Sequence, residues 1–135
     1  GTCGPGVTIC PPLRCDYGLH IHVGEGTFIN YDCVLLDAAD IHIGAHCQIA
    51  PRVTLITSTH PLEPQPRSLG WESAAPITLH DNVWLGAGVI VLPGVTIGAD
   101  TVVGAGSVVT KDLPSGVVAV GTPARVVRDL AQNAR

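Results

Sequence analysis

The residue with the clearest capacity for chemistry is His60, which ends the stretch Leu55-Ile-Thr-Ser-Thr-His60 directly before a proline-rich segment. An imidazole accepts a proton near neutral pH, which is the work of a general base. Glu72 lies in the same segment and could orient this imidazole or stabilise its protonated form, as the acidic member of a hydrolytic triad does. The alternative is a surface histidine that precedes a proline turn.

The other histidines form a weaker pattern. His20 and His22 flank Ile21, so in a strand both point away from the face of Ile21. A metal centre built on His22 and His42 is one interpretation, but no ligand set with supporting partners emerges from the spacing. We therefore expect an exposed polar row here and no bound metal.

Basic residues gather toward the C-terminus, where they suit a phosphorylated ligand or form a solvated charged end. They are joined by one threonine, and the group is Thr110, Lys111, Arg125 and Arg128. Short glycine pairs such as Gly86-Ala-Gly88 lack the third glycine and the strand-to-helix context of a phosphate-binding loop.

A period of six residues organises the elements that must position these side chains. One aliphatic residue recurs every six positions at Leu79, Leu85, Val91, Ile97, Val103 and Val109, and the same spacing runs through Val23–Leu35 and Ile43–Leu55. Four positions after most of these stands a small or β-branched residue, such as Val83 or Thr59. The period fits neither a helix nor a two-faced strand.

Such a period is typical of a short strand followed by a tight turn, three of which close a triangular coil of about eighteen residues. The sequence therefore predicts an all-β fold, a hexapeptide-repeat prism, with a bulged corner where the phase slips by two residues around residues 37–40. A β-sandwich rich in Gly and Val, with coincidental spacing, is the alternative.

Two segments interrupt the repeat. Residues 61–76 hold four prolines and no hexad, so they are expected to form a loop extruded from the prism, and long irregular loops are usually functional. Thr122 and Pro123 resemble an N-cap and first helical residue, which predicts a short capping helix over 122–132. The whole chain, 1–135, is predicted to be a single domain.

Composition excludes several classes of protein. The chain has 135 residues, of which 46% are hydrophobic and only 13% charged, which is too apolar for a disordered protein. It contains no apolar run of bilayer length, and its net charge of −4 comes with no basic stripe, so we expect neither a membrane nor a nucleic-acid partner. Five cysteines without CxxC spacing, and no leader, predict a reduced, cytoplasmic protein.

Taken together, these features resemble the hexapeptide-repeat acetyltransferases of the maltose, galactoside and nodulation O-acetyltransferase branch. The resembling stretches keep the order and spacing of that family; they are Cys15-Asp-Tyr-Gly18, Phe28-Ile-Asn30, Thr57-Ser-Thr-His-Pro-Leu62, Asp81-Asn-Val-Trp-Leu-Gly86, Pro93-Gly-Val-Thr-Ile-Gly98, Gly104-Ala-Gly-Ser-Val-Val-Thr-Lys111 and Gly121-Thr-Pro-Ala-Arg-Val-Val-Arg128. The resemblance implies a left-handed parallel β-helix, a homotrimer, and transfer of acetyl from acetyl-CoA to a hydroxyl of a sugar or oligosaccharide. The family's N-terminal helical segment is absent from this sequence.

The resemblance also implies roles for individual residues. His60 matches the general base, and Glu72 matches an acidic loop position beside it. The positions on the acceptor side are Asp16, Asn30 and Asp37, and Trp71 could stack on a sugar ring or pack a subunit contact. The positions that contact coenzyme A are Trp84, Ala87, Ala105, Thr110, Lys111, Arg125 and Arg128.

The expected reaction is direct attack of the acceptor oxygen on the thioester in a ternary complex, in a pocket between neighbouring subunits that the 61–76 loop overhangs. Two other functions remain open. One is a non-catalytic trimeric scaffold. The other is a zinc enzyme similar to a carbonic anhydrase, for which His22, His42 and His46 are the only plausible ligands.

Overall fold

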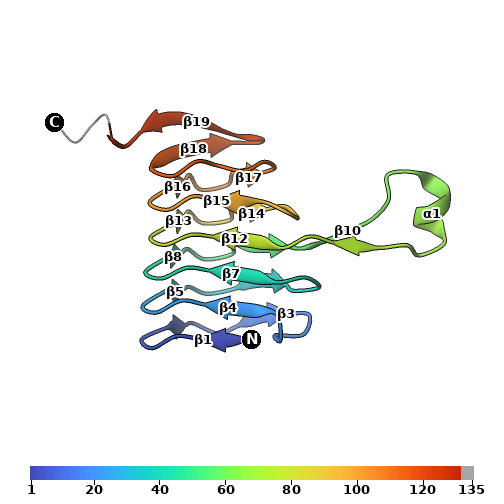
Figure 1. The fold of residues 1–135 in the computed structure, drawn as a ribbon, viewed down its shortest axis with the longest axis horizontal. Helices are drawn as coiled ribbons and strands as arrows, with labels where there is room; N and C mark the ends of the chain where they lie inside the picture. Colours follow the sequence, from blue (N-terminus) through green and yellow to red (C-terminus); the bar gives the residue numbers. More distant parts are fainter. Residues whose placement is uncertain (132–135) are drawn as a thin grey trace.

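The computed structural model describes residues 1–131 and shows a β-helix whose coils stack along one axis (Figure 1). The chain enters at one end of the stack, and the last strands lie at the other end. The predicted hexapeptide-repeat fold is confirmed, since strands from successive coils pair in parallel throughout the stack.

Three sheets form the sides of this prism. The first sheet comprises β1 (Thr2–Cys3), β4 (Ile21–Val23), β7 (Ile41–Ile43), β12 (Ile77–Leu79) and β15 (Thr96–Ile97). The second comprises β2 (Thr8–Ile9), β5 (Phe28–Ile29), β8 (Gln48–Ile49), β13 (Trp84–Leu85), β16 (Val102–Val103), β18 (Val117–Gly121) and β19 (Ala124–Asp129). The third comprises β3 (Leu13–Cys15), β6 (Cys33–Leu36), β9 (Thr54–Ile56), β14 (Ile90–Val91) and β17 (Val108–Val109).

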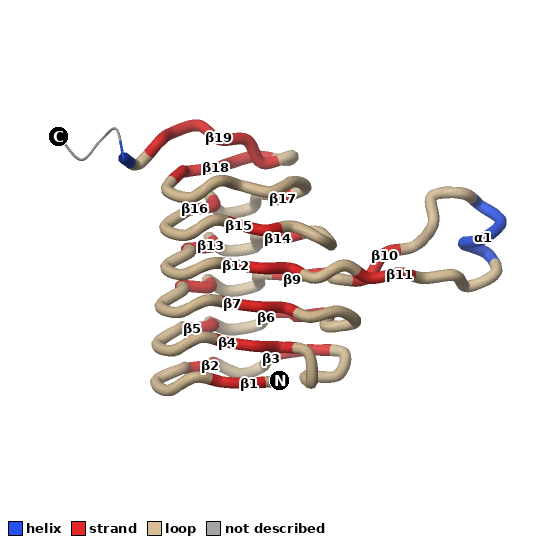
Figure 2. The backbone as a smooth tube through the Cα atoms, in the orientation of Figure 1, coloured by secondary structure: helices blue, strands red, loops and turns tan. Residues whose placement is uncertain are grey.

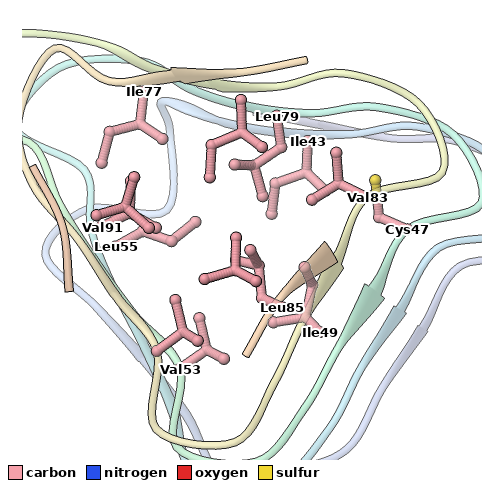
Figure 3. Packing of buried hydrophobic residues seen from close by; sticks show 14 of the residues in the cluster. Ile43, Cys47, Ile49, Val53, Leu55, Ile77, Leu79, Val83, Leu85 and Val91 are labelled. Carbon is pink, nitrogen blue, oxygen red and sulfur yellow. The ribbon is translucent and has the colours of Figure 1, made fainter. Parts of the chain in front are cut away.

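The register of these sheets stacks the hexad residues on one another. In the second sheet, for example, Ile29, Ile49, Leu85 and Val103 are consecutive Cα partners. All four are buried, and together with their counterparts from the other sheets they fill the axis of the prism (Figure 3). Each fully buried Leu or Ile contributes about 1.5–3 kcal/mol, so this column is the main source of stability.

The small residues four positions later fill the corners of the prism. Most of them are buried; the buried ones are Thr27, Cys33, Cys47, Val53, Val83, Val89, Val95, Thr101 and Ser107. Burial raises the pKa of the Cys33 and Cys47 thiols, whose sulfurs donate to the carbonyl oxygens of Ala50 and His80. Thr59 is an exception to the predicted pattern, because the chain has already left the prism there and Thr57 is buried instead.

The predicted extruded loop is a hairpin arm that begins slightly earlier than expected. Strands β10 (Ser58–Thr59) and β11 (Ser73–Ala74) pair in antiparallel fashion and carry α1 (Pro64–Ser68) at the tip, well outside the prism (Figure 2). We call residues 58–74 the arm. Among the described residues, no helix is long and apolar enough to cross a membrane.

The predicted capping helix over 122–132 is wrong. Residues 124–129 form β19, which runs antiparallel to β18 and covers the end of the second sheet. An isolated short helix is marginal in water, whereas the free edge of β18 offers a row of backbone hydrogen bonds and Val126-Val127 favours a strand. Residue 132 of the predicted helix lies outside the described part of the chain.

If the buried aliphatic residues along the axis are the main source of stability, replacing Ile97 should cost much more unfolding free energy than replacing its neighbour Thr96 in β15. Replacing Ile97, which is fully buried, with alanine leaves a cavity and should lower the free energy of unfolding by about 2–5 kcal/mol. The control is Thr96→Ala in the same strand, because Thr96 points outward and should cost less than about 1 kcal/mol. Urea unfolding at one fixed protein concentration measures both; equal losses would show that the axial column is not the main source of stability.

Candidate functional site

Four of the predicted site residues lie along one edge of the prism, where the third sheet leads into the first. We call this the loop edge; it consists of the corner at 16–20, the corner at 37–40 and the base of the arm, from successive coils. Asp16, Asp37, His60 and Glu72 all belong to it. The structure therefore brings Asp16 and Asp37 of the predicted acceptor side to the same edge as the predicted base, whereas Asn30 lies elsewhere.

Asp37 stabilises the corner at residues 16–20 through hydrogen bonds to its backbone. Its side chain is fully buried, and its Oδ1 accepts hydrogen bonds from the backbone N–H groups of Asp16 (3.1 Å) and Tyr17 (2.9 Å), while Oδ2 accepts one from His20 (3.1 Å). Burial alone raises the pKa of Asp37, but the backbone hydrogen bonds from Tyr17 and His20 outweigh it and hold the pKa below its ordinary value of 3.8. Both carboxylate oxygens are thus engaged by the protein, and Asp37 acts on Asp16 by positioning its loop.

Thr57 links the middle corner to the base of the arm. Its hydroxyl donates to the Leu36 carbonyl oxygen (2.6 Å) and accepts from the Ala39 N–H (2.9 Å), while its own carbonyl accepts from Ala75 (2.9 Å). The sequence did not single out Thr57. The only signal in the sequence was that Thr57 follows the repeat strand one coil after the corner at 37–40, where the hexad phase slips by two residues.

The pairing of β10 with β11 sets His60 against Glu72. Ser58 pairs with Ala74 and Thr59 with Ser73, so the register continued by one residue puts His60 opposite Glu72. Opposed residues of an antiparallel pair project from the same face. Both side chains are exposed, and in the described structure no hydrogen bond or ion pair joins them.

The segment that follows His60 is fixed by Arg67, another residue that the sequence analysis missed. The guanidinium Nη1 donates to the carbonyl oxygens of Pro61 (3.2 Å) and Leu62 (2.8 Å) and so ties α1 to the strand exit. Beyond it, the arm exposes large apolar side chains: Leu62 is 88% exposed, Leu69 69% and Trp71 66%. Apolar side chains gathered on a projecting arm are typical of a surface that another molecule covers.

A second group of predicted residues lies along a different edge, where the second sheet leads into the third. We call it the Asn30 edge; Asn30, Ala87 and Ala105 occupy three of its turns, and the turn at 50–53 lies between those of Asn30 and Ala87. A Cβ on Gly86 would lie 2.6 Å from the Ala105 nitrogen, so glycine is needed for these two turns to stack closely. Asn30 also lines a shallow depression on the second sheet with Phe28, Gln48, Ala50 and Trp84.

The predicted phosphate-binding residues occupy separate parts of the prism. Arg125 pairs with Val120, whose side chain lies over Gly104, so Arg125 lies beyond the Gly104 turn at the end of the Asn30 edge. Arg128 lies further along the same strand, opposite Val118 and away from the Asn30 edge. Thr110 and Lys111 come directly after β17, at a later corner of the loop edge. A single chain therefore does not bring the four residues together.

The three-histidine zinc set is not assembled either. The rings of His22 and His42 are stacked with centroids 4.7 Å apart, but His46 lies at the edge between the first and second sheets, with Nε2 3.7 Å from Glu25 Oε1. The structure thus separates His46 from the other two.

Within one chain, the loop edge can supply a base with a carboxylate opposite it, and the Asn30 edge can supply a shallow surface for an extended ligand. The third sheet separates the two edges within one chain.

Comparison with known proteins yields consistent matches. The family model described as "Bacterial transferase hexapeptide (six repeats)" matches residues 76–111. A galactoside O-acetyltransferase of Lactococcus lactis is 46% identical over 128 residues, which cover 94% of this chain and 62% of that protein. A maltose O-acetyltransferase from Clostridium difficile has a crystal structure that superposes with a TM-score of 0.94 at 49% identity, covering 96% of this chain and 69% of that one.

A third match was crystallised with a ligand. The hexapeptide-repeat acetyltransferase of Vibrio cholerae, in complex with acetyl coenzyme A, superposes with a TM-score of 0.94 at 41% identity and covers 96% of this chain and 70% of that one. The chain spans between 58% and 69% of the length of eight curated relatives that it matches.

The lowered pKa of Asp37 predicts how the stability of the loop edge depends on pH. The carboxylate contributes fully to stability above its ordinary pKa of 3.8, and the contribution is lost as the pH falls through its lower value in the folded protein. Asp37→Asn should therefore cost about 1–3 kcal/mol at pH 7 and progressively less at more acid pH.

Thermal or urea unfolding between pH 7 and the acid limit of folding measures this difference. The control is Asp32→Asn, since Asp32 is exposed at a turn and its replacement should change stability little at any pH. A cost of Asp37→Asn that stays constant down to the acid limit would contradict the assignment.

Proposed function

The chain belongs to the hexapeptide-repeat acetyltransferases of the maltose, galactoside and nodulation branch, and from this premise we propose that it transfers acetyl from acetyl-CoA to a hydroxyl group of a sugar or oligosaccharide. One observation carries the proposal: the register of β10 and β11 sets His60 opposite Glu72 at the base of an arm on the loop edge. A carboxylate on the same face of the hairpin is available to the imidazole as the partner that a general base uses.

The proposed reaction needs no covalent enzyme intermediate. His60 accepts the proton of the acceptor hydroxyl while that oxygen bonds to the thioester carbonyl carbon. The carbon–sulfur bond then breaks, and the coenzyme thiolate takes up the proton from His60 to leave as the free thiol. Glu72 stabilises the imidazolium between these two steps, and the products are an acetyl ester and coenzyme A.

Acetyl-CoA is proposed to bind along the Asn30 edge. The depression beside Trp84, the stacked turns at Ala87 and Ala105, and Arg125 at the end form a continuous path over successive coils. Arg125 and Arg128 of one chain, with Thr110 and Lys111 of a neighbour, would then meet the phosphate groups. Binding energy from this remote part of the substrate positions the thioester.

The proposed active unit is a homotrimer with its active sites between subunits. The loop edge and the Asn30 edge of one chain lie on either side of the third sheet, so His60 of one chain reaches a coenzyme bound on its neighbour. The exposed apolar side chains of the arm, including Leu62 and Leu69, are expected to be covered by that neighbour.

The acceptor would lie at the loop edge beside His60. Asp16 offers a carboxylate to sugar hydroxyls, Trp71 offers a ring that can stack on a sugar face, and Asn30 reaches in from the neighbouring chain. Asp37 would act on the acceptor indirectly, because its hydrogen bonds to the backbone position the loop that carries Asp16. All five cysteines are unpaired, which agrees with a reaction in the cytoplasm, where thiols stay reduced.

Removing the base tests the proposal directly. His60→Ala should lower kcat for acetyl transfer by about 10²- to 10⁴-fold and leave acetyl-CoA binding intact, because the coenzyme residues are elsewhere. Release of free coenzyme A thiol, assayed against a panel of mono- and oligosaccharides, measures the rate. His80→Ala is the matched control, since His80 is an exposed turn residue outside both edges.

Two outcomes of this assay would overturn the proposal. Undiminished turnover by His60→Ala would exclude His60 as the base. A parent protein that binds acetyl-CoA but acetylates no acceptor would favour the non-catalytic scaffold.

Mixed trimers test whether the site is shared. His60→Ala and Trp84→Ala each damage one edge, so co-expression of the two variants should regenerate intact sites at about one quarter of the positions if sites form between chains. If each site lies within one chain, every chain carries a defect and activity stays at the level of the single variants. Differently tagged chains, co-purified before assay, provide the measurement.

A further inference from the structure

We propose that the outer face of the first sheet carries a binding site for a divalent transition-metal ion of the zinc class, with His22, Asp40 and His42 as ligands. This site is separate from the proposed acetyl-transfer site, and it departs from the expectation of no metal drawn from the sequence. Within the described residues, these three form the one group of His, Cys, Asp and Glu whose ligand atoms lie mutually within 4.8 Å.

The backbone brings the two histidines together. His22 in β4 and His42 in β7 are direct partners in the parallel ladder, so their side chains leave the sheet at adjacent positions on its outer face. Their rings are stacked, with centroids 4.7 Å apart and planes inclined by 13°. The register is fixed by the buried neighbours Val23 and Ile43, so the pair persists without any ion.

Asp40 completes the set from the adjacent corner. Its Oδ1 lies 3.5 Å from His22 Nε2 and its Oδ2 lies 4.0 Å from His42 Nε2, so the carboxylate faces both imidazoles. The two-residue slip in the hexad phase creates this corner and places Asp40 just before β7. That is why the pattern of histidines alone did not reveal a third ligand.

A further contact orients His22. Its Nδ1 is hydrogen-bonded to the Thr2 hydroxyl at 3.0 Å, so Nε2 remains the nitrogen directed at Asp40. Metal-binding histidines commonly engage their second nitrogen in such a hydrogen bond, which fixes the ring for coordination.

The distances suit a small ion after a modest adjustment. Zinc–ligand bonds of about 2.0–2.2 Å place two tetrahedral ligands roughly 3.4 Å apart. The two histidine–carboxylate separations are close to this value, and the stacked rings need to tilt toward each other at their Nε2 ends. The side chains of His22, Asp40 and His42 are 30%, 50% and 51% exposed, so they have room to do so.

The donor set favours zinc-class ions over magnesium or calcium. Two imidazoles and one carboxylate match the preferences of zinc, nickel and copper, whereas magnesium and calcium prefer oxygen ligands throughout. An ion held there would connect two successive coils, so binding should also raise the melting temperature.

Titration with Co²⁺ and Zn²⁺ tests the site on the full chain. We expect the parent to bind about one equivalent, with the weak visible bands of Co²⁺ bound to nitrogen and oxygen ligands. Co²⁺ bound to cysteine thiolates instead gives strong near-ultraviolet charge-transfer absorption, which distinguishes this site from the exposed Cys3 and Cys15. The same samples report the rise in melting temperature by calorimetry.

Variants assign the ligands. His42→Ala and Asp40→Asn should each weaken binding at least tenfold and abolish the rise in melting temperature. His46→Ala is the control, because this exposed histidine has a carboxylate neighbour of its own, Glu25, at a different edge, and should bind as the parent does.

The proposal fails if the parent binds no ion, if thiolate absorption accounts for the bound Co²⁺, or if His42→Ala binds as tightly as the parent. Circular dichroism of each variant confirms that the prism is folded. Since acetyl transfer is not the readout, none of these outcomes depends on the proposed function.

Discussion

The structure depends on one packing constraint: in the coils that follow the first, the sides of the prism contribute aliphatic side chains to a narrow axis. Ile49, Leu85 and Val103 stack in this column because parallel backbone hydrogen bonds hold successive coils in register. The interior has no room for larger groups, which restricts the corners to small residues such as Thr27 and Ser107. Chemistry is therefore confined to the edges and outer faces of the prism.

The two edges divide the proposed chemistry between them. At the loop edge, the buried Asp37 carboxylate and the Thr57 hydroxyl join three successive corners, so the arm bearing His60 leaves a rigid base. At the Asn30 edge, the close stacking of turns at Gly86 and Ala105 leaves a smooth surface beside Trp84. A flat-sided solenoid offers only shallow concavity, and for this reason the proposed site is formed between neighbouring copies.

The prism could be predicted from the sequence, because aliphatic residues at a period of six determine both where the strands lie and how they pair. It failed at the C-terminus, where Thr122 and Pro123 mimic a helix start while the open edge of β18 favours a strand. The opposition of His60 and Glu72 depends on a hairpin register that cannot be read across the eleven residues between them. The roles of Asp37, Arg67 and Asp40 depend on corner geometry, and irregular corners have no periodicity to reveal them.

A crystal structure of the assembled protein with coenzyme A bound tests the central claim most directly. The account predicts a trimer in which the thiol end of each coenzyme lies within hydrogen-bond reach of the His60 imidazole of one chain while its length follows the Asn30 edge of the next. A monomer, or a coenzyme whose thiol approaches His60 and Trp84 of the same chain, would contradict it.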